Sequence, residues 1–170
     1  MEDERAKLID RLAETRATLV EVARDLDRET WTQPVYAHGE PNEWSAMDLL
    51  RHLAWAEGGM LRLLRQIKAG EEGVPADFDL DRYNATGVQK LKSEMPAELL
   101  QRMAANRQEV IDFIATLEED DWEKKGRHGS LRVMTIREIC ELIASHEAEH
   151  LRDMRQRLRL GERPPDATTA

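Results

Sequence analysis

Hydrophobic positions recur at helical spacing in four long segments of the chain. Between residues 3 and 27 they alternate steps of four and three residues, along a seam made of Leu8, Leu12, Thr15, Leu19, Val22 and Leu26. Residues 45–69, 80–117 and 135–160 repeat this spacing. A period near 3.6 residues is typical of a helix that buries one face. Four such helices predict an all-α fold, and most simply a four-helix bundle.

Short signals indicate where these helices begin and end. Ser45 precedes Asp48 by three residues, and Thr135 precedes Glu138 by the same interval. Such pairs are typical of a helix start, where each side chain bonds a free backbone amide of the other residue. Gly70 is expected to end the second helix. Pro96 suits the first turn of a helix, so residues 80–117 form either one kinked helix or two helices.

The segments between the helices lack a hydrophobic period and contain the chain's loop-forming residues. Residues 28–44, 70–79 and 118–134 are therefore predicted as loops, and no strand is expected in them. These connections are longer than a minimal up-and-down bundle needs. The aromatic residues of the first are expected to pack across a bundle end or to line the mouth of a pocket: Trp31, Tyr36 and Trp44. Residues 1–161 are expected to form one domain, and residues 162–170 a flexible tail.

Three histidines fall on predicted apolar faces. His146 and His150 are four residues apart, so they lie on the same side of one helix, within its apolar arc. His52 lies at the edge of the apolar face of residues 45–69. Imidazoles on facing helices could hold zinc, nickel, copper or iron(II), with one coordination position left open as in a catalytic site. The alternative is that they make hydrogen bonds in the core.

Several other residues are candidates for supporting roles. Glu57 and Glu147 lie toward apolar faces, where either could accept a hydrogen bond from a metal-bound imidazole. Glu57 could equally pair with an arginine. Cys140, the only cysteine, is expected to be a buried structural thiol, and His38 and His128 are expected at the surface.

Two further features of residues 45–69 carry predictions. Gly58 and Gly59 are unusual inside a helix, since each costs roughly 1 kcal/mol relative to alanine. The close approach of another helix or of a ligand would explain them, and a local kink is the alternative. Trp55 points away from the predicted core and is a candidate dimer-interface residue.

Composition narrows the classes of function. The 170 residues carry a formal net charge of −9, which argues against binding nucleic acid or an anionic membrane surface. The charged N-terminal residues do not resemble a signal peptide, and no apolar run is long enough to cross a membrane. A cytoplasmic location is the resulting expectation.

The histidines also lie in two motifs that resemble those of the DinB/YfiT-like superfamily. The first is Trp44-Ser45-x-x-Asp48-Leu49-Leu50-x-His52-Leu53-x-x-x-Glu57, and the second is His146-x-x-x-His150. The segments 79–84 and 117–122 extend the similarity over nearly the whole chain. The resemblance implies an up-down-down-up four-helix bundle, a homodimer, and a divalent ion, zinc or nickel, bound by His52, His146 and His150.

The resemblance also suggests classes of activity. The family includes thiol-dependent S-transferases, a mycothiol-dependent isomerase, and members called metal-dependent hydrolases whose substrates are unknown. We therefore expect a metal-dependent enzyme of the thiol-dependent transferase or isomerase type, acting on a small molecule with a low-molecular-weight thiol as cosubstrate. The alternatives are a hydrolase that uses a metal-bound hydroxide and a non-enzymatic bundle that binds a small ligand.

Overall fold

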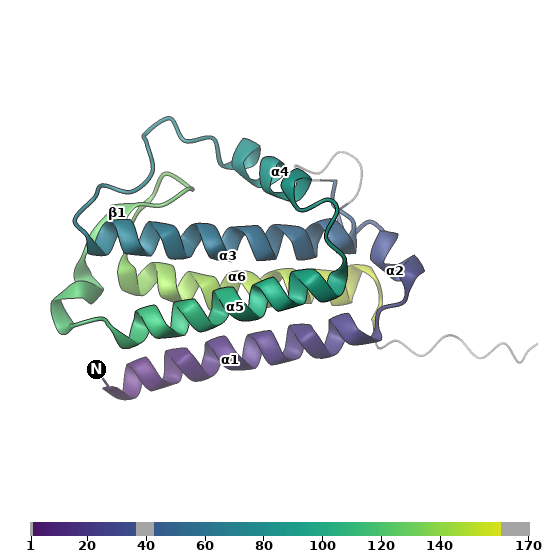
Figure 1. The fold of residues 1–170 in the computed structure, drawn as a ribbon, viewed down its shortest axis with the longest axis horizontal. Helices are drawn as coiled ribbons and strands as arrows, with labels where there is room; N and C mark the ends of the chain where they lie inside the picture. The colour runs from purple at the N-terminus through teal and green to yellow at the C-terminus, as the bar shows by residue number, and fades with distance from the viewer. Residues whose placement is uncertain (1, 37–42, 161–170) are drawn as a thin grey trace, which may run out of the picture.

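Four long helices form a bundle in the computed structural model, which describes residues 2–36 and 43–160 (Figure 1). α1 (Glu2–Asp25) and α6 (Ile136–Arg157) run in one direction, and α3 (Ala46–Lys68) and α5 (Pro96–Ala115) run in the opposite one. This up-down-down-up order confirms the predicted fold class. The shorter elements are α2 (Arg28–Thr32), α4 (Leu80–Lys90), a 3₁₀ helix η1 (Glu119–Glu123), and strands β1 (Lys125–Arg127) and β2 (Val133–Thr135).

The two predicted helix-start signals are present. Ser45 Oγ accepts a hydrogen bond from the Asp48 amide at 3.2 Å, and Thr135 Oγ1 accepts one from the Glu138 amide at 3.1 Å. In both pairs the acidic side chain accepts from the first residue's amide in return. Both helices that carry the candidate histidines are thus started by reciprocal caps.

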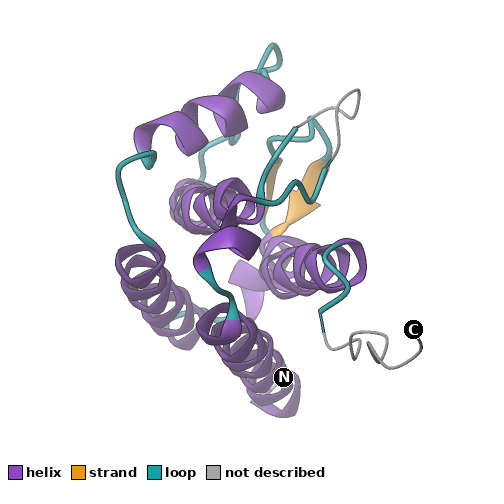
Figure 2. Ribbon diagram, turned by 90° about the vertical axis from the view of Figure 1, so that its right-hand side faces the viewer, coloured by secondary structure: helices purple, strands orange, loops and turns teal. Residues whose placement is uncertain are grey.

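The long connection between α3 and α5 contains a separate helix. α4 ends at Lys90 and α5 begins at Pro96, so residues 80–117 form two helices. α4 packs across the outer side of α3 (Figure 2). Gly87 allows this contact, since a Cβ there would lie 2.2 Å from the ring of Trp55. Trp55 is therefore half-buried beneath α4; its place in a dimer interface, like the homodimer itself, stays a prediction.

The short elements α2, η1, β1 and β2 were not expected from the sequence. Residues 28–32 form α2, which Asp27 caps, inside a segment predicted as a loop. Residues 125–135 form an antiparallel hairpin in which Lys125 faces Thr135 and Arg127 faces Val133. The prediction of no strand was therefore wrong, because strands of three residues are too short to show the alternating pattern by which strands are found in a sequence.

The loop between α3 and α4 continues the hairpin. The Arg127 amide donates to the Glu72 carbonyl at 2.7 Å, and the Val74 amide donates to the Arg127 carbonyl at 2.9 Å. Gly73 lies between them with φ +90°, and a Cβ there would lie 2.4 Å from the Arg127 carbonyl oxygen. The hairpin and this loop therefore form one continuous cover over the end of α3.

Four buried charged residues tie the long helices together, one from each helix: Arg16, Glu57, Arg107 and Glu147. Arg16 Nη2 lies 2.6 Å from Glu57 Oε2 and 2.7 Å from Glu147 Oε2. Arg107 Nε lies 2.5 Å from Glu57 Oε1, and Arg107 Nη2 lies 3.1 Å from Glu147 Oε2. The guanidinium groups also donate to backbone carbonyls, Arg16 to Met103 and Arg107 to Leu12. We call this set the charge quartet.

The rest of the core is aliphatic and aromatic. Its largest fully buried members are spread over the four long helices and include Leu12, Leu64, Leu99 and Ile143. None of the helices that the structure describes is long and apolar enough to cross a membrane. The predicted domain limits, residues 1–161, stay a prediction, and the predicted tail lies outside the described residues.

Candidate metal centre

The three candidate histidines meet between α3 and α6. His52 Nε2 and His150 Nε2 each lie 3.1 Å from His146 Nε2. One ring nitrogen from each residue lies within 4.8 Å of the other two. The helical spacing of His146 and His150 places them on one face of α6, and α3 brings His52 across from them. The structure thus assembles the three residues that the sequence singled out.

The chemistry of this cluster fits a divalent cation. His146 Nε2 is close to two other ring nitrogens, but one imidazole nitrogen has either a single proton or a single lone pair. It cannot satisfy both neighbours by hydrogen bonding alone. Three neutral imidazoles around a zinc ion, with Zn–N near 2.0–2.1 Å, place their nitrogens about 3.3 Å apart. The two separations from His146 Nε2, each 3.1 Å, are near that value, and all three nitrogens lie within 4.8 Å of one another.

Burial keeps the cluster in the form that a metal requires. Loss of solvent lowers the pKa of His146 to about 3 and lowers the pKa of His52 well below its usual 6.5. Burial also lowers the pKa of His150, although Asp153 opposes this shift. Metal binding needs the neutral imidazole. All three side chains therefore present a free lone pair at neutral pH.

Aromatic residues from the connection after α1 close one side of the cluster. Tyr36 Oη lies 2.9 Å from His150 Nδ1 and donates to Asp153 Oδ2 at 2.7 Å. The Trp44 ring lies over His52, with centroids 4.5 Å apart and planes inclined by 33°. Because Tyr36 gives its proton to Asp153, its oxygen accepts from His150 Nδ1–H. That bond leaves His150 Nε2 free to face the cluster.

The two glutamates proposed to support the histidines do something else. Glu57 and Glu147 bind Arg16 and Arg107 in the charge quartet, and among the described residues neither bonds a histidine. Pairing with arginine, the alternative considered for Glu57, is what the structure shows. The orienting contact comes instead from Tyr36, whose only sequence signal was its place in an aromatic-rich connection.

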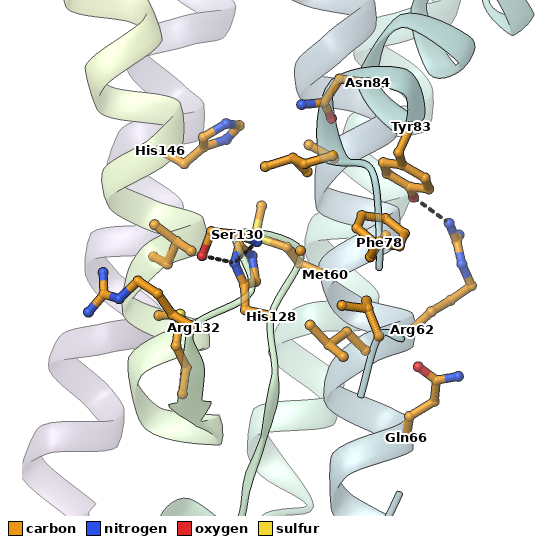
Figure 3. Close-up of a pocket in the computed structure, with 18 of the residues that line it drawn as sticks. Met60, Arg62, Gln66, Phe78, Tyr83, Asn84, His128, Ser130, Arg132 and His146 are labelled. Atoms are coloured by element: carbon orange, nitrogen blue, oxygen red, sulfur yellow. Dashed lines mark hydrogen bonds between the residues drawn. The ribbon is translucent and has the colours of Figure 1, made fainter. Parts of the chain in front are cut away.

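A cavity of about 480 Å³ opens on the other side of the cluster. His52 and His146 line it, and its walls come from α3, α6, α4, the loop before α4 and the hairpin (Figure 3). Most of its exposed lining surface is apolar, although nine of the nineteen lining residues are polar, among them Tyr83, His128 and Arg132. No carboxylate of the described part of the chain lines it. The histidine cluster therefore faces a small, mainly apolar chamber.

The remaining sequence predictions have mixed outcomes. His128 is half-buried on the hairpin and lines the cavity, so its placement at the surface was wrong. His38 lies outside the described residues. Cys140 is buried as predicted, and burial raises the pKa of its thiol to about 12. Close approach explains Gly59, because a Cβ there would lie 2.4 Å from the Tyr83 hydroxyl, whereas a Cβ on Gly58 would make only ordinary contact, 3.5 Å from Asn106 Nδ2.

Comparisons with known proteins agree with this arrangement. YfiT from Bacillus subtilis, described as a probable metal-dependent hydrolase with an unusual four-helix bundle topology, superposes with a TM-score of 0.77 at 18% sequence identity. The match covers 94% of this chain and 88% of YfiT. The uncharacterized protein YuaE of Bacillus subtilis (strain 168) is 27% identical over 128 residues, which are 67% of this chain and 76% of YuaE. A family model described as the DinB superfamily matches residues 11–154, so the chain belongs to that superfamily.

Proposed function

We propose that this protein is a metal-dependent enzyme in which His52, His146 and His150 hold one divalent ion, zinc or nickel. The observation that carries the proposal is the convergence of three imidazole nitrogens at the end of a cavity. Three protein ligands leave a coordination position for a substrate atom. The YfiT description, a probable metal-dependent hydrolase on the same fold, supports the same class.

The chain's own residues prepare this site for a small molecule. Trp44 and Tyr36 contact the cluster on one side, and the cavity gives a ligand an approach to His52 and His146. Tyr36 and Asp153 fix the orientation of the His150 ring. A bound divalent ion would supply Lewis acidity, which lowers the pKa of a thiol or a water that binds it.

The reaction that we favour is thiol-dependent transfer or isomerisation, with a low-molecular-weight thiol as cosubstrate. The cavity supports this because cationic side chains, Arg62 and Arg132, line it and no described carboxylate does. A thiolate or a carboxylate-bearing electrophile would meet favourable charges there. Hydrolysis is the second candidate, supported by the YfiT description.

Metal analysis of the purified protein tests the site. The wild-type protein should hold one ion per chain, and changing any one of the three cluster histidines to alanine should abolish stoichiometric binding. His128→Ala is the matched control, because this histidine lines the same cavity without belonging to the cluster. Unchanged metal content in His52→Ala would refute the three-histidine site.

An activity screen then separates the two reactions. Metal-loaded protein is assayed with low-molecular-weight thiols plus an electrophile, and separately with activated esters. Thiol consumption that disappears on metal removal supports transfer, and ester cleavage without thiol supports hydrolysis. Stoichiometric metal with neither activity would favour a non-enzymatic ligand-binding bundle.

A further inference from the structure

The cavity wall next to the histidine cluster is apolar on both helices. Ala56 follows His52 by four residues on α3, and Leu142 precedes His146 by four residues on α6. Residues four apart lie one above the other on a helix, so these side chains continue the cluster's own faces into the cavity. Met60 and Leu63 extend the α3 wall further. A ligand that leaves the cluster must therefore run between hydrocarbon surfaces.

The cover over this channel is also largely apolar. The loop before α4 supplies Val74 and Phe78, α4 begins with Leu80, and the hairpin supplies Met134 (Figure 3). A cavity of about 480 Å³ is within the usual range for small-molecule sites. These side chains give the hydrocarbon part of a ligand a wall to pack against, apart from Arg62 and Arg132, which line the same cavity.

The contacts of His128 show which of its two ring nitrogens carries the proton and can donate a hydrogen bond. Its Nδ1 accepts the Ser130 backbone N–H at 3.2 Å and lies 3.1 Å from Ser130 Oγ. Because Nδ1 is an acceptor, the proton of the neutral ring is on Nε2. No described group bonds Nε2. Burial lowers the pKa of His128, with Arg132 adding to the shift, so the neutral ring prevails at pH 7.

His128 lines the same cavity as the cluster residues His52 and His146. The hairpin that carries His128 is held by backbone bonds to the loop before α4. The donor is thus held in the wall of the cavity that the histidine cluster faces.

On the basis of the proposed function, we propose that the cavity binds a small molecule with a metal-binding head and an unbranched apolar chain, and that His128 Nε2 donates a hydrogen bond to the head. The chain lies between Ala56 on α3 and Leu142 on α6. His128 is a residue that selects and positions the ligand.

Alkylhydroxamates of increasing chain length are suitable probes, because they combine a metal-binding head that carries acceptor oxygens with a variable hydrocarbon tail. Calorimetric titration of the zinc-loaded protein should show affinity rising about fourfold for each added methylene over the first several, the increment expected for full burial. Ala56→Leu narrows the channel next to His52 and should end this rise at a shorter chain. Affinity that does not change with chain length would overturn the apolar channel.

Variants of the hairpin test the hydrogen bond separately. His128→Leu should weaken every hydroxamate by about five- to tenfold, as loss of one hydrogen bond does, and leave the increment for each methylene intact. Val133→Thr is the matched control, because this residue is 64% exposed on the same hairpin, and it should change neither quantity. Equal affinities for His128→Leu and wild type would refute the donor.

Zinc content distinguishes failure of this inference from failure of the proposed function. If the protein binds zinc and acetohydroxamate, but hydroxamate affinity changes neither with chain length nor in His128→Leu, only the inference is wrong. If it binds no zinc, the proposed function fails and the inference fails with it.

Discussion

Glu57→Gln should destabilise the bundle far more than its small chemical change suggests. The substitution keeps the shape of the side chain but removes a charge that two arginines share. Glu57 Oε2 lies 2.6 Å from Arg16 Nη2, and Glu57 Oε1 lies 2.5 Å from Arg107 Nε. The three side chains are only 4–9% exposed. The variant leaves two buried guanidinium groups with one carboxylate, that of Glu147.

The expected loss is about 3–5 kcal/mol, the range for removing one partner of a buried ion pair. An exposed pair in the same bundle supplies the matched control. Arg65 Nη2 lies 3.0 Å from Glu109 Oε2, and both side chains are more than half exposed. Solvent screens that pair, so Glu109→Gln should cost at most about 1 kcal/mol.

Urea unfolding followed by circular dichroism measures both effects. With a slope near 2 kcal/mol per molar urea, Glu57→Gln should move the midpoint down by roughly 2 M and Glu109→Gln by less than about 0.5 M. Glu57→Gln should keep its metal, since Glu57 bonds arginines and not histidines. Similar midpoints for the two variants would refute the claim that the charge quartet is a coupled buried unit.

Three further predictions concern single side chains. Tyr36→Phe removes the hydrogen-bond acceptor of His150 Nδ1 and should lower the metal affinity about 10- to 100-fold. Competition with a chromophoric chelator measures this affinity, and an unchanged value would show that Tyr36 does not orient the ring. Burial raises the pKa of the Cys140 thiol from 9.0 to about 12, so at pH 8 its thiolate fraction falls from about one in ten to about one in 10,000. Cys140 should therefore not react with a disulfide reagent at pH 8 until the protein unfolds. Rapid labelling of the folded protein would contradict this. Gly87→Ala should lower stability by about 1–3 kcal/mol in thermal unfolding, despite better helix propensity, because its Cβ would strike Trp55; a rise in melting temperature would contradict the close contact.

The features that the sequence predicted correctly depend on local periodicity. The spacing of apolar residues located the long helices, and the capping pairs located the starts of α3 and α6 within one residue. His146 and His150 were placed on a common face by the helix turn alone. His52 joined them only because α3 and α6 were assumed to be neighbours, and the structure places its Nε2 3.1 Å from His146 Nε2.

The features that were missed depend on contacts between residues far apart in the chain. Arg16 and Arg107 occupy seam positions four residues after Leu12 and Met103, where an arginine can be taken for a break in the pattern. The seam was assigned to Thr15 instead, which is half-buried beside Arg16. The sequence did contain a signal for a buried ion pair. An arginine stands at an apolar position of one helix, and a glutamate stands at an apolar position of another.

The long connections that fit a minimal bundle poorly have a structural reason in this protein. α3 and α5 run in the same direction, so the chain must return along the bundle between them, and α4 and its preceding loop form that return. The same segment supplies part of the cavity wall. A parallel pair of neighbouring helices therefore creates the covering element that a shorter up-and-down connection would lack.

The charge quartet and the histidine cluster also share two helices. Glu147 follows His146 directly on α6, and Glu57 lies five residues after His52 on α3, so each helix turns one polar group toward the arginines and another toward the cluster. A slip of one turn between these helices would move their side chains about 5.4 Å past each other. That shift exceeds the 4.8 Å span of the three histidine nitrogens and would also break the ion pairs. The contacts that fix the helix register are thus the ones that bring the histidines together.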